Sequence, residues 1–296
     1  MVMYANCHMH STFSDGIYTP EKLVAIGKAL GHKGMILTDH DTVSGTYFMQ
    51  RAARRAGIRS ILGCEFSAIG PENCEIHVLG FDFNPNNKKM AALLKDMSSQ
   101  SHNTARYLLE KGMERGTVKK GIVWQDILEE YPYNDYISNN QIFKLMVKRG
   151  IYKPEEYREF FVSSFKQTAE RKAEMAAAFS FKFQAVDDVI KTIIEAEGVP
   201  VIAHLGEAPY GKIDYTEELY SLGAMGFEIC HPGNNDEARD YLSKFCDEHG
   251  LYKTGGTDHS ADLGGLRSGF PKHNIPNDCG GMNEEDFTKL YERALG

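Results

Sequence analysis

The stretch ANCHMHSTFSDG occupies residues 5–16 and carries two histidines close to the end of a short apolar run. The apolar residues before them predict a buried strand, and His8 and His10 stand at positions i and i+2 near its end. Side chains two positions apart on a strand point to the same face, so both imidazoles can bind one metal ion. The stretch therefore predicts a metal site where the first strand of the fold ends.

Outward from this stretch, six further apolar runs carry residues of the kinds that bind metals. All but one of the runs carry them at or near the end of the predicted strand, and the exception is His77, near the middle of the fourth. The residues concerned are Asp39, His40, Asp41, Glu65, His77, His204, His231, Asp258 and His259. Packing alone does not explain so many ionisable groups at strand ends, because such groups are rarely buried without partners. The pattern indicates a site that holds more than one metal ion.

The outer thirds of the chain alternate apolar runs with amphipathic helical patterns. One such helix begins after Thr19, with Pro20 at its first position and Gly31 just past its end. This alternation of predicted strands and helices indicates an α/β fold of seven strands with mostly parallel pairing. A barrel is favoured over an open doubly wound sheet, because a barrel brings the carboxyl ends of all its parallel strands to one face.

The middle of the chain, residues 95–196, has almost no β-branched runs and consists of successive helical patterns. We therefore expect a barrel formed by residues 1–94 and 197–296. The segment 95–196 is expected to be a helical insertion that faces the substrate as a cap.

The composition narrows the function classes. The 296 residues carry a formal net charge of −8, which disfavours binding to long nucleic acids. There is no apolar run of the ~18 residues that a membrane span requires. Six cysteines are scattered without CxxC pairs, as expected for reduced thiols in a cytoplasmic protein. The sequence predicts no particular oligomeric state.

Three motifs resemble those of the polymerase and histidinol phosphatase (PHP) family: HMHSTFSDG at 8–16, TDHDT at 38–42 and GTDH at 256–259, together with Glu65 and His204. The resemblance implies a distorted (β/α)7 barrel that hydrolyses phosphate esters. The helical segment is similar to the insertion of the small-molecule branch, which includes nucleoside 3′,5′-bisphosphate phosphatases and cyclic phosphate dihydrolases. The implied substrate is a small phosphorylated metabolite, either a ribose cyclic phosphodiester or a nucleoside or sugar phosphate.

The resemblance also implies two or three divalent metal ions (Mn, Zn or Fe). Their ligands are His8, His10, Glu65 and Asp258 for the first ion; Glu65, His77 and His204 for the second; and Asp15, His40 and His259 for the third. A hydroxide bridging two metals would be the nucleophile.

Several residues are candidates for the remaining roles. The leaving group needs a proton, which His259, His231 or Asp15 could supply. His231 and Arg267 are candidates for binding the substrate phosphate. Asp39 and Asp41 are expected either to orient histidines or to cap a loop.

Three other functions compete with this hypothesis. An amidohydrolase-type deaminase or amidase also places His-x-His on a barrel strand, but no lysine stands at a strand end beside the ligands here. A polymerase-associated exonuclease is disfavoured by the acidic balance of the chain. A non-catalytic metal-binding domain is disfavoured because the ligand set is nearly complete.

Overall fold

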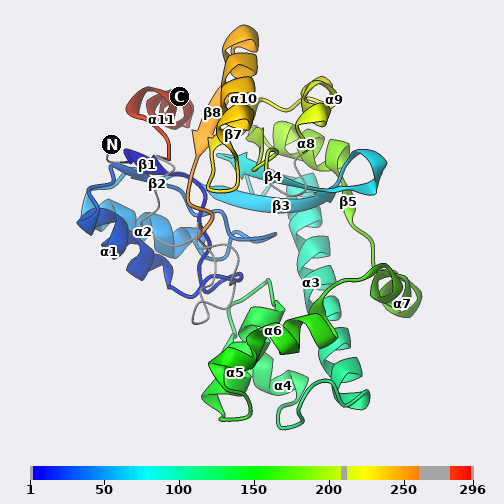
Figure 1. Cartoon of the computed structure of the whole chain (residues 1–296). Helices are drawn as coiled ribbons and strands as arrows, with labels where there is room; N and C mark the ends of the chain where they lie inside the picture. The colour runs from blue at the N-terminus through cyan, green and yellow to red at the C-terminus, as the bar shows by residue number, and fades with distance from the viewer. Residues whose placement is uncertain (1–2, 208–211, 260–280, 295–296) are drawn as a thin grey trace.

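The computed structural model describes residues 3–207, 212–259 and 281–294 (Figure 1). The strands are β1 (Ala5–Asn6), β2 (Gly34–Met35), β3 (Gly63–Ile69), β4 (Glu75–Phe81), β5 (Gln184–Ala185), β6 (Val199–Ile202), β7 (Gly226–Cys230) and β8 (Tyr252–Gly255). The helices are α1 (Pro20–Ala29), α2 (Thr46–Ala56), α3 (Lys88–Glu114), α4 (Trp124–Glu130), α5 (Asn139–Lys148), α6 (Tyr157–Phe160), α7 (Ala169–Phe179), α8 (Val186–Glu195), α9 (Thr216–Ser221), α10 (Asp236–His249) and α11 (Glu284–Arg293).

The strands form two sheets. β1 and β2 pair in parallel, and the six-stranded sheet has the order β5-β3-β4-β6-β7-β8. Isolated parallel bridges join the two sheets, one between Met9 and His259 and one between His40 and Glu65. The predicted α/β class is confirmed, whereas one continuous, regularly paired barrel is not seen among the described residues.

β4 runs against both of its neighbours. It is antiparallel to β3 and to β6, while the β6–β7 and β7–β8 pairs are parallel. The amino end of β4 therefore lies beside the carboxyl end of β6. This reversal explains why His77, near the start of its strand, reaches the same place as His204, just after the end of β6.

Apolar packing covers both faces of β4. Ile76 and Val78 pack with α8 and α10, through residues such as Ile190 and Leu242. Leu79 on the other face packs in a cluster that draws residues from both sheets and from α11, listed in chain order as Ala5, Ile36, Phe81, Val201 and Phe287. The strand ends that carry polar residues are thus fixed from two sides by buried apolar side chains.

The end of α3 and the helices α4 to α7 form a unit with its own core, which we call the helical unit (residues 105–181). Its buried side chains all lie between Ala105 and Met175, and Phe143 and Phe160 are among the largest. Figure 1 shows α3 running from the sheet into this unit, and its 27 residues span about 40 Å at 1.5 Å per residue. α8 follows the unit and returns the chain to the sheet.

None of the described helices is both long enough and apolar enough to span a membrane.

Candidate metal centre

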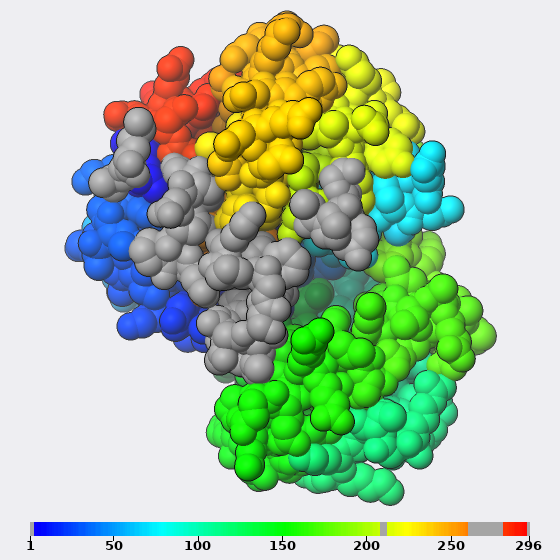
Figure 2. All heavy atoms as spheres, in the orientation of Figure 1, coloured from blue at the N-terminus to red at the C-terminus, as the bar shows by residue number. Residues whose placement is uncertain are grey.

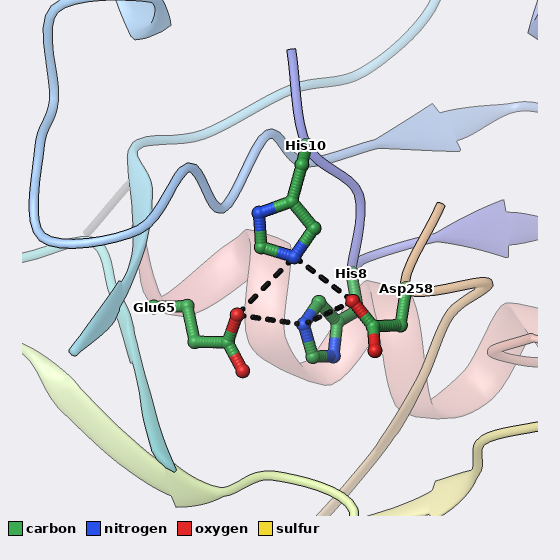
Figure 3. Close-up of side chains that lie close together, drawn as sticks. All are labelled: His8, His10, Glu65 and Asp258. Atoms are coloured by element: carbon green, nitrogen blue, oxygen red, sulfur yellow. Dashed lines mark hydrogen bonds and ion pairs between the residues drawn. The ribbon is translucent and has the colours of Figure 1, made fainter. Parts of the chain in front are cut away.

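The two histidines after β1 meet a glutamate of β3 and an aspartate that follows β8 (Figure 3). His8 Nε2 lies 3.2 Å from Glu65 Oε2 and 3.5 Å from Asp258 Oδ1. His10 Nε2 lies 3.2 Å from the same Glu65 oxygen and 2.9 Å from the same Asp258 oxygen. Residues from three distant segments thus turn one ligand atom each toward a common centre.

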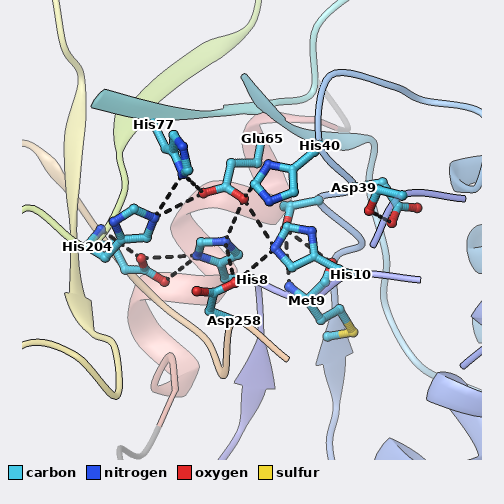
Figure 4. A network of polar contacts seen from close by, with 12 residues as sticks. His8, Met9, His10, Asp39, His40, Glu65, His77, His204 and Asp258 are labelled. Atoms are coloured by element: carbon cyan, nitrogen blue, oxygen red, sulfur yellow. Dashed lines mark hydrogen bonds and ion pairs between the residues drawn. The ribbon is translucent and has the colours of Figure 1, made fainter. Parts of the chain in front are cut away.

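The second Glu65 oxygen faces another pair of histidines (Figure 4). Oε1 lies 2.9 Å from His77 Nδ1 and 3.1 Å from His204 Nε2, and these two nitrogens are 3.2 Å apart. His40 Nδ1 approaches the first oxygen, Oε2, at 3.3 Å. One carboxylate therefore stands between two groups of imidazoles, which is the arrangement of a bridging ligand.

A further group contains His10, Asp15 and His40. His10 Nδ1 lies 3.6 Å from Asp15 Oδ1, and the rings of His10 and His40 stack with their centroids 4.5 Å apart. His259 lies in none of the metal-binding groups found among the described residues; its ring stacks on Tyr18 at 5.4 Å. Its predicted role as a ligand or a proton donor stays a prediction.

Some buried atoms at this centre have no hydrogen-bond partner in the part of the chain that the structure describes. They include His8 Nε2, His40 Nδ1 and Glu65 Oε2. Leaving such atoms unpaired costs free energy. A divalent cation would satisfy all three, because imidazole nitrogens and carboxylate oxygens are its usual ligands. The donor set therefore fits divalent metal ions.

Electrostatics keeps two of these residues in the form that binds metals. Burial raises the pKa of Glu65, but the neighbouring His8, His40 and His77 outweigh it and hold the pKa well below its usual value. Burial lowers the pKa of His40 to about 4, against the opposing charge of Glu65. Glu65 is thus an ionised carboxylate and His40 a neutral imidazole at neutral pH.

The histidines after β1 behave differently when no metal is bound. Burial lowers the pKa of His8, but Glu228 and two further carboxylates raise it well above its usual value. Burial likewise lowers the pKa of His10, and the charge of Asp15 with the hydrogen bond to Asp258 raises it to about 10. Both imidazoles must therefore give up a proton to a metal ion.

Glu228 is a functional candidate that sequence reasoning missed. It lies on β7, is fully buried, and its Oε1 is 2.9 Å from His8 Nδ1. Its Oε2 accepts a hydrogen bond from the backbone N–H of His204 at 3.0 Å. A carboxylate on the far nitrogen of a histidine fixes the ring for metal binding. The sequence did contain an indication of its role, because Glu228 is a charged residue inside the apolar stretch GFEIC, which forms the buried strand β7.

His231 is buried beside the first group of ligands. Its Nε2 lies 3.2 Å from Asp258 Oδ2, and its Nδ1 accepts a hydrogen bond from the Gly233 N–H at 2.9 Å. It also forms a possible metal-binding group with His8 and Glu228. Arg267, the other candidate for phosphate binding, lies outside the described residues.

The two aspartates of the TDHD motif, Asp39 and Asp41, accept hydrogen bonds from a loop and from a strand. Asp39 accepts hydrogen bonds from Ser11 N at 2.6 Å, from Ser11 Oγ at 2.7 Å and from Ser14 Oγ at 2.6 Å. Asp41 accepts one from the backbone N–H of Ser67 at 2.8 Å. These contacts support the loop-capping alternative.

The backbone around the ligands is locally strained and tightly packed. His204 and Asp258 have positive φ angles of 32° and 45°, which cost on the order of 1–3 kcal/mol each for residues with side chains. At Gly256 an added Cβ would lie 2.3 Å from the His8 backbone nitrogen. Only glycine therefore lets the segment after β8 approach His8 so closely.

Comparisons with known proteins find one family model and several relatives. The PHP domain family model matches residues 6–198. The chain is 26% identical over 280 residues to a 3′,5′-nucleoside bisphosphate phosphatase of Chromobacterium violaceum, covering 92% of each chain. It is 27% identical over 267 residues to a 5′-3′ exoribonuclease of Haemophilus influenzae, covering 88% of this chain and 92% of the relative.

Two further similarities extend the comparison. A phosphoribosyl 1,2-cyclic phosphate 1,2-diphosphodiesterase of Eggerthella lenta is 25% identical over 267 residues, covering 88% of this chain and 96% of the relative. The fold is similar to a solved structure of a candidate metal-dependent phosphoesterase from Bifidobacterium adolescentis, with a TM-score of 0.75, 24% identity, and coverage of 98% and 96% of the two chains. Because the family model spans well over half of its length, the chain belongs to the PHP domain family.

Proposed function

We propose that the chain hydrolyses a small phosphorylated metabolite, either a ribose cyclic phosphodiester or a nucleoside or sugar phosphate. The broader activity, metal-dependent hydrolysis of phosphate esters, follows from its family and from relatives that align over most of its length. The observation that carries the proposal is the position of Glu65, whose two oxygens face different groups of imidazoles.

The proposed metal ligands fall into three groups that share residues. The first comprises His8, His10, Glu65 and Asp258; the second Glu65, His77 and His204; and the third His10, Asp15 and His40. When bound, divalent ions lower the pKa of coordinated water and neutralise charge on phosphoryl oxygens.

The chain's own residues hold the site in its reactive arrangement. Glu228 fixes the ring of His8, and the ionised Glu65 keeps five histidine rings directed at its two oxygens. His231 accepts a hydrogen bond at Nδ1, so its proton sits on Nε2, next to Asp258. We propose that this Nε2–H binds a substrate phosphate oxygen, because a neutral imidazole that gave it up would become an imidazolate. His259, Asp15 and a doubly protonated His231 are the candidate donors of a proton to the leaving group.

A cleft between the sheet and the helical unit offers room for the substrate. One side is lined by Asp41, Ser67 and Glu75, and the helical unit contributes Tyr136. Residues 181–184, which lead from the helical unit into β5, also line the cleft. Figure 2 shows the surface hollowed between the helical unit and the rest of the molecule. We propose that the segment 95–196 is an insertion that caps this cleft, against a barrel formed by residues 1–94 and 197–296.

Phosphate release from a panel of esters tests the proposed substrate class. The panel contains nucleoside 3′,5′-bisphosphates, ribose cyclic phosphates, histidinol phosphate and a short oligoribonucleotide, each with Mn²⁺ or Zn²⁺ and with an EDTA control. We expect metal-dependent release from one of the small esters. Faster release of mononucleotides from the oligoribonucleotide than of phosphate from any small ester would instead favour an exonuclease, as named for the Haemophilus influenzae relative. Ammonia release from amino-substituted rings, with no phosphate release, would favour a deaminase.

His8→Ala tests the site itself. The substitution removes a ligand atom from the first group, so phosphate release should fall to background while the far-UV circular dichroism is retained. His249→Ala, at the end of α10, is the matched control and should keep full activity. Full turnover by His8→Ala would show that the reaction takes place elsewhere.

A further inference from the structure

The loop that carries Asp15 is held by side chains of the helical unit. Asn134 Nδ2 donates to the Thr12 carbonyl at 2.7 Å, and Gln141 Nε2 donates to the Ser14 carbonyl. Asn140 Nδ2 donates to the Asp15 carbonyl at 3.1 Å, and Lys144 Nζ donates to the Gly16 carbonyl at 2.6 Å. Four donors from residues 134–144 thus bind four carbonyls within a five-residue loop, residues 12–16.

The two central donors are buried and held in one orientation. Asn140 is 2% exposed and Gln141 is 1% exposed. The Asn140 oxygen accepts hydrogen bonds from Tyr157 OH at 2.5 Å and from Asn139 Nδ2 at 3.0 Å, so its NH₂ group faces Asp15. The Gln141 oxygen accepts from the Ser138 backbone N–H at 2.9 Å, so its NH₂ group faces Ser14.

The opposite side of the loop is tied to the sheet. Asp39, just after β2, accepts hydrogen bonds from Ser11 and Ser14. Between the two anchors, the Asp15 carboxylate lies 3.6 Å from His10 Nδ1, in the group that also contains His40. The position of this carboxylate thus depends on the helical unit as well as on the sheet.

We infer that Asn140 and Gln141 are positioning residues, which hold Asp15 in its metal-binding group by fixing the backbone of its loop. The inference rests on the proposed function only in requiring that metal ions bind at this site. The helical unit then contributes to metal affinity without supplying a ligand from its own side chains. A contact that merely docked the unit would affect stability or substrate binding and leave metal affinity unchanged.

Isosteric substitutions test the inference. Asn140→Asp and Gln141→Glu keep the size and the accepting oxygen of each side chain, but replace the NH₂ donor by a second oxygen that faces a carbonyl. Gln125→Glu, on the exposed face of α4, is the matched control. Mn²⁺ binding to metal-depleted protein is measured by isothermal titration calorimetry, together with thermal unfolding, and no phosphate ester is needed.

We expect both variants to lose one Mn²⁺ or to bind it about 10–100-fold more weakly, as is usual when support of a ligand is removed. Gln125→Glu should bind as the unaltered protein does. Unchanged Mn²⁺ constants in both variants, even with a lower melting temperature, would overturn the inference. The measurement is of metal binding and needs no substrate. The inference can therefore be contradicted even if phosphate release is observed, and it can be supported even if no ester is hydrolysed.

Lys144 provides a second test should the buried variants not fold. Lys144→Met removes the donor to Gly16 at the half-buried end of the same contact, while Lys144→Arg retains a donor. Lys148→Met is the control on the same helix, because Lys148 pairs with Glu130 at the surface. Weaker Mn²⁺ binding in Lys144→Met alone, restored in Lys144→Arg, is the expected result. Equal binding in all three variants would contradict the inference.

Discussion

Glu228 determines how His8 is presented, although it lies behind the metal site. Glu228→Gln keeps the side chain's size and one accepting oxygen but removes the negative charge beside His8 Nδ1. Metal affinity should fall about 10–100-fold, while the fold is retained. Calorimetric titration with Mn²⁺ measures this loss, and Glu237→Gln, on the exposed face of α10, is the control. Equal affinity in both variants would mean that Glu228 has no part in metal binding.

His10 couples metal binding to pH. Its pKa is raised to about 10 in the metal-free protein, so the imidazole is protonated at pH 7 and must release that proton to a metal. Apparent metal affinity should therefore increase as the pH rises toward 10, by up to tenfold per pH unit for each proton released. His40, with a pKa of about 4, adds nothing to this dependence above about pH 5.

The proton release can be measured directly. Mn²⁺ titrations at pH 7 in two buffers of different ionisation enthalpy should give different heats. The difference equals the number of protons released multiplied by the difference in ionisation enthalpy. Identical heats in the two buffers would show that His8 and His10 are already neutral before the metal binds.

At the scale of elements, the sequence predicted the seven strands that carry the ligand-type residues, as well as the start of α1. The helix begins at Pro20 and is capped by Thr19, because these positions follow local rules. The reversal of β4 could not be predicted, since an apolar run has the same pattern in either direction. β5 was missed because it has two residues, which pair with β3 and form no periodic pattern.

The sequence indicated candidate ligands at strand ends, and the structure brings His8, His10, Glu65 and Asp258 together; that they bind metal stays a prediction. Glu228 was missed because a residue inside a strand gives no sign of which neighbouring side chain it faces. The contacts of Asn140 and Gln141 with the Asp15 loop were missed for a different reason. They join segments about 125 positions apart and depend on how the helical unit packs on the sheet.

Gly256 allows the segment after β8 to pass very close to the residues that follow β1. In Gly256→Ala the new methyl group would overlap the backbone nitrogen of His8, which cannot move without displacing the ligand ring. We expect loss of metal binding together with a destabilisation of about 1–3 kcal/mol. Gly150→Ala is the comparison: its Cβ meets no atom within 4 Å, and its cost is confined to a left-handed φ of 69°. Tight metal binding by Gly256→Ala would contradict the close approach.

For the whole molecule, the metal site should act as a cross-link between distant parts of the chain. Ions that bind only the folded protein stabilise it by about 2.7 kcal/mol when the free concentration is 100 times the dissociation constant. The melting temperature should therefore rise with added Mn²⁺ and fall to a constant value in EDTA. His8→Ala, which lacks one ligand, should show a smaller rise. A melting temperature independent of Mn²⁺ in the unaltered protein would exclude tight binding to the folded state.

The separation of the candidate ligands in the sequence also determines when, during synthesis of the chain, their group can be completed. His10 and Asp258, which face each other at 2.9 Å, are 248 positions apart. At about 5–20 residues per second, roughly 12–50 s pass between the synthesis of one and of the other. The growing chain therefore carries its histidines through most of its synthesis without the aspartate that completes their group. Loading of the group that contains Asp258 would therefore wait until that residue is made, whereas the group of His10, Asp15 and His40 is complete after the first 40 residues.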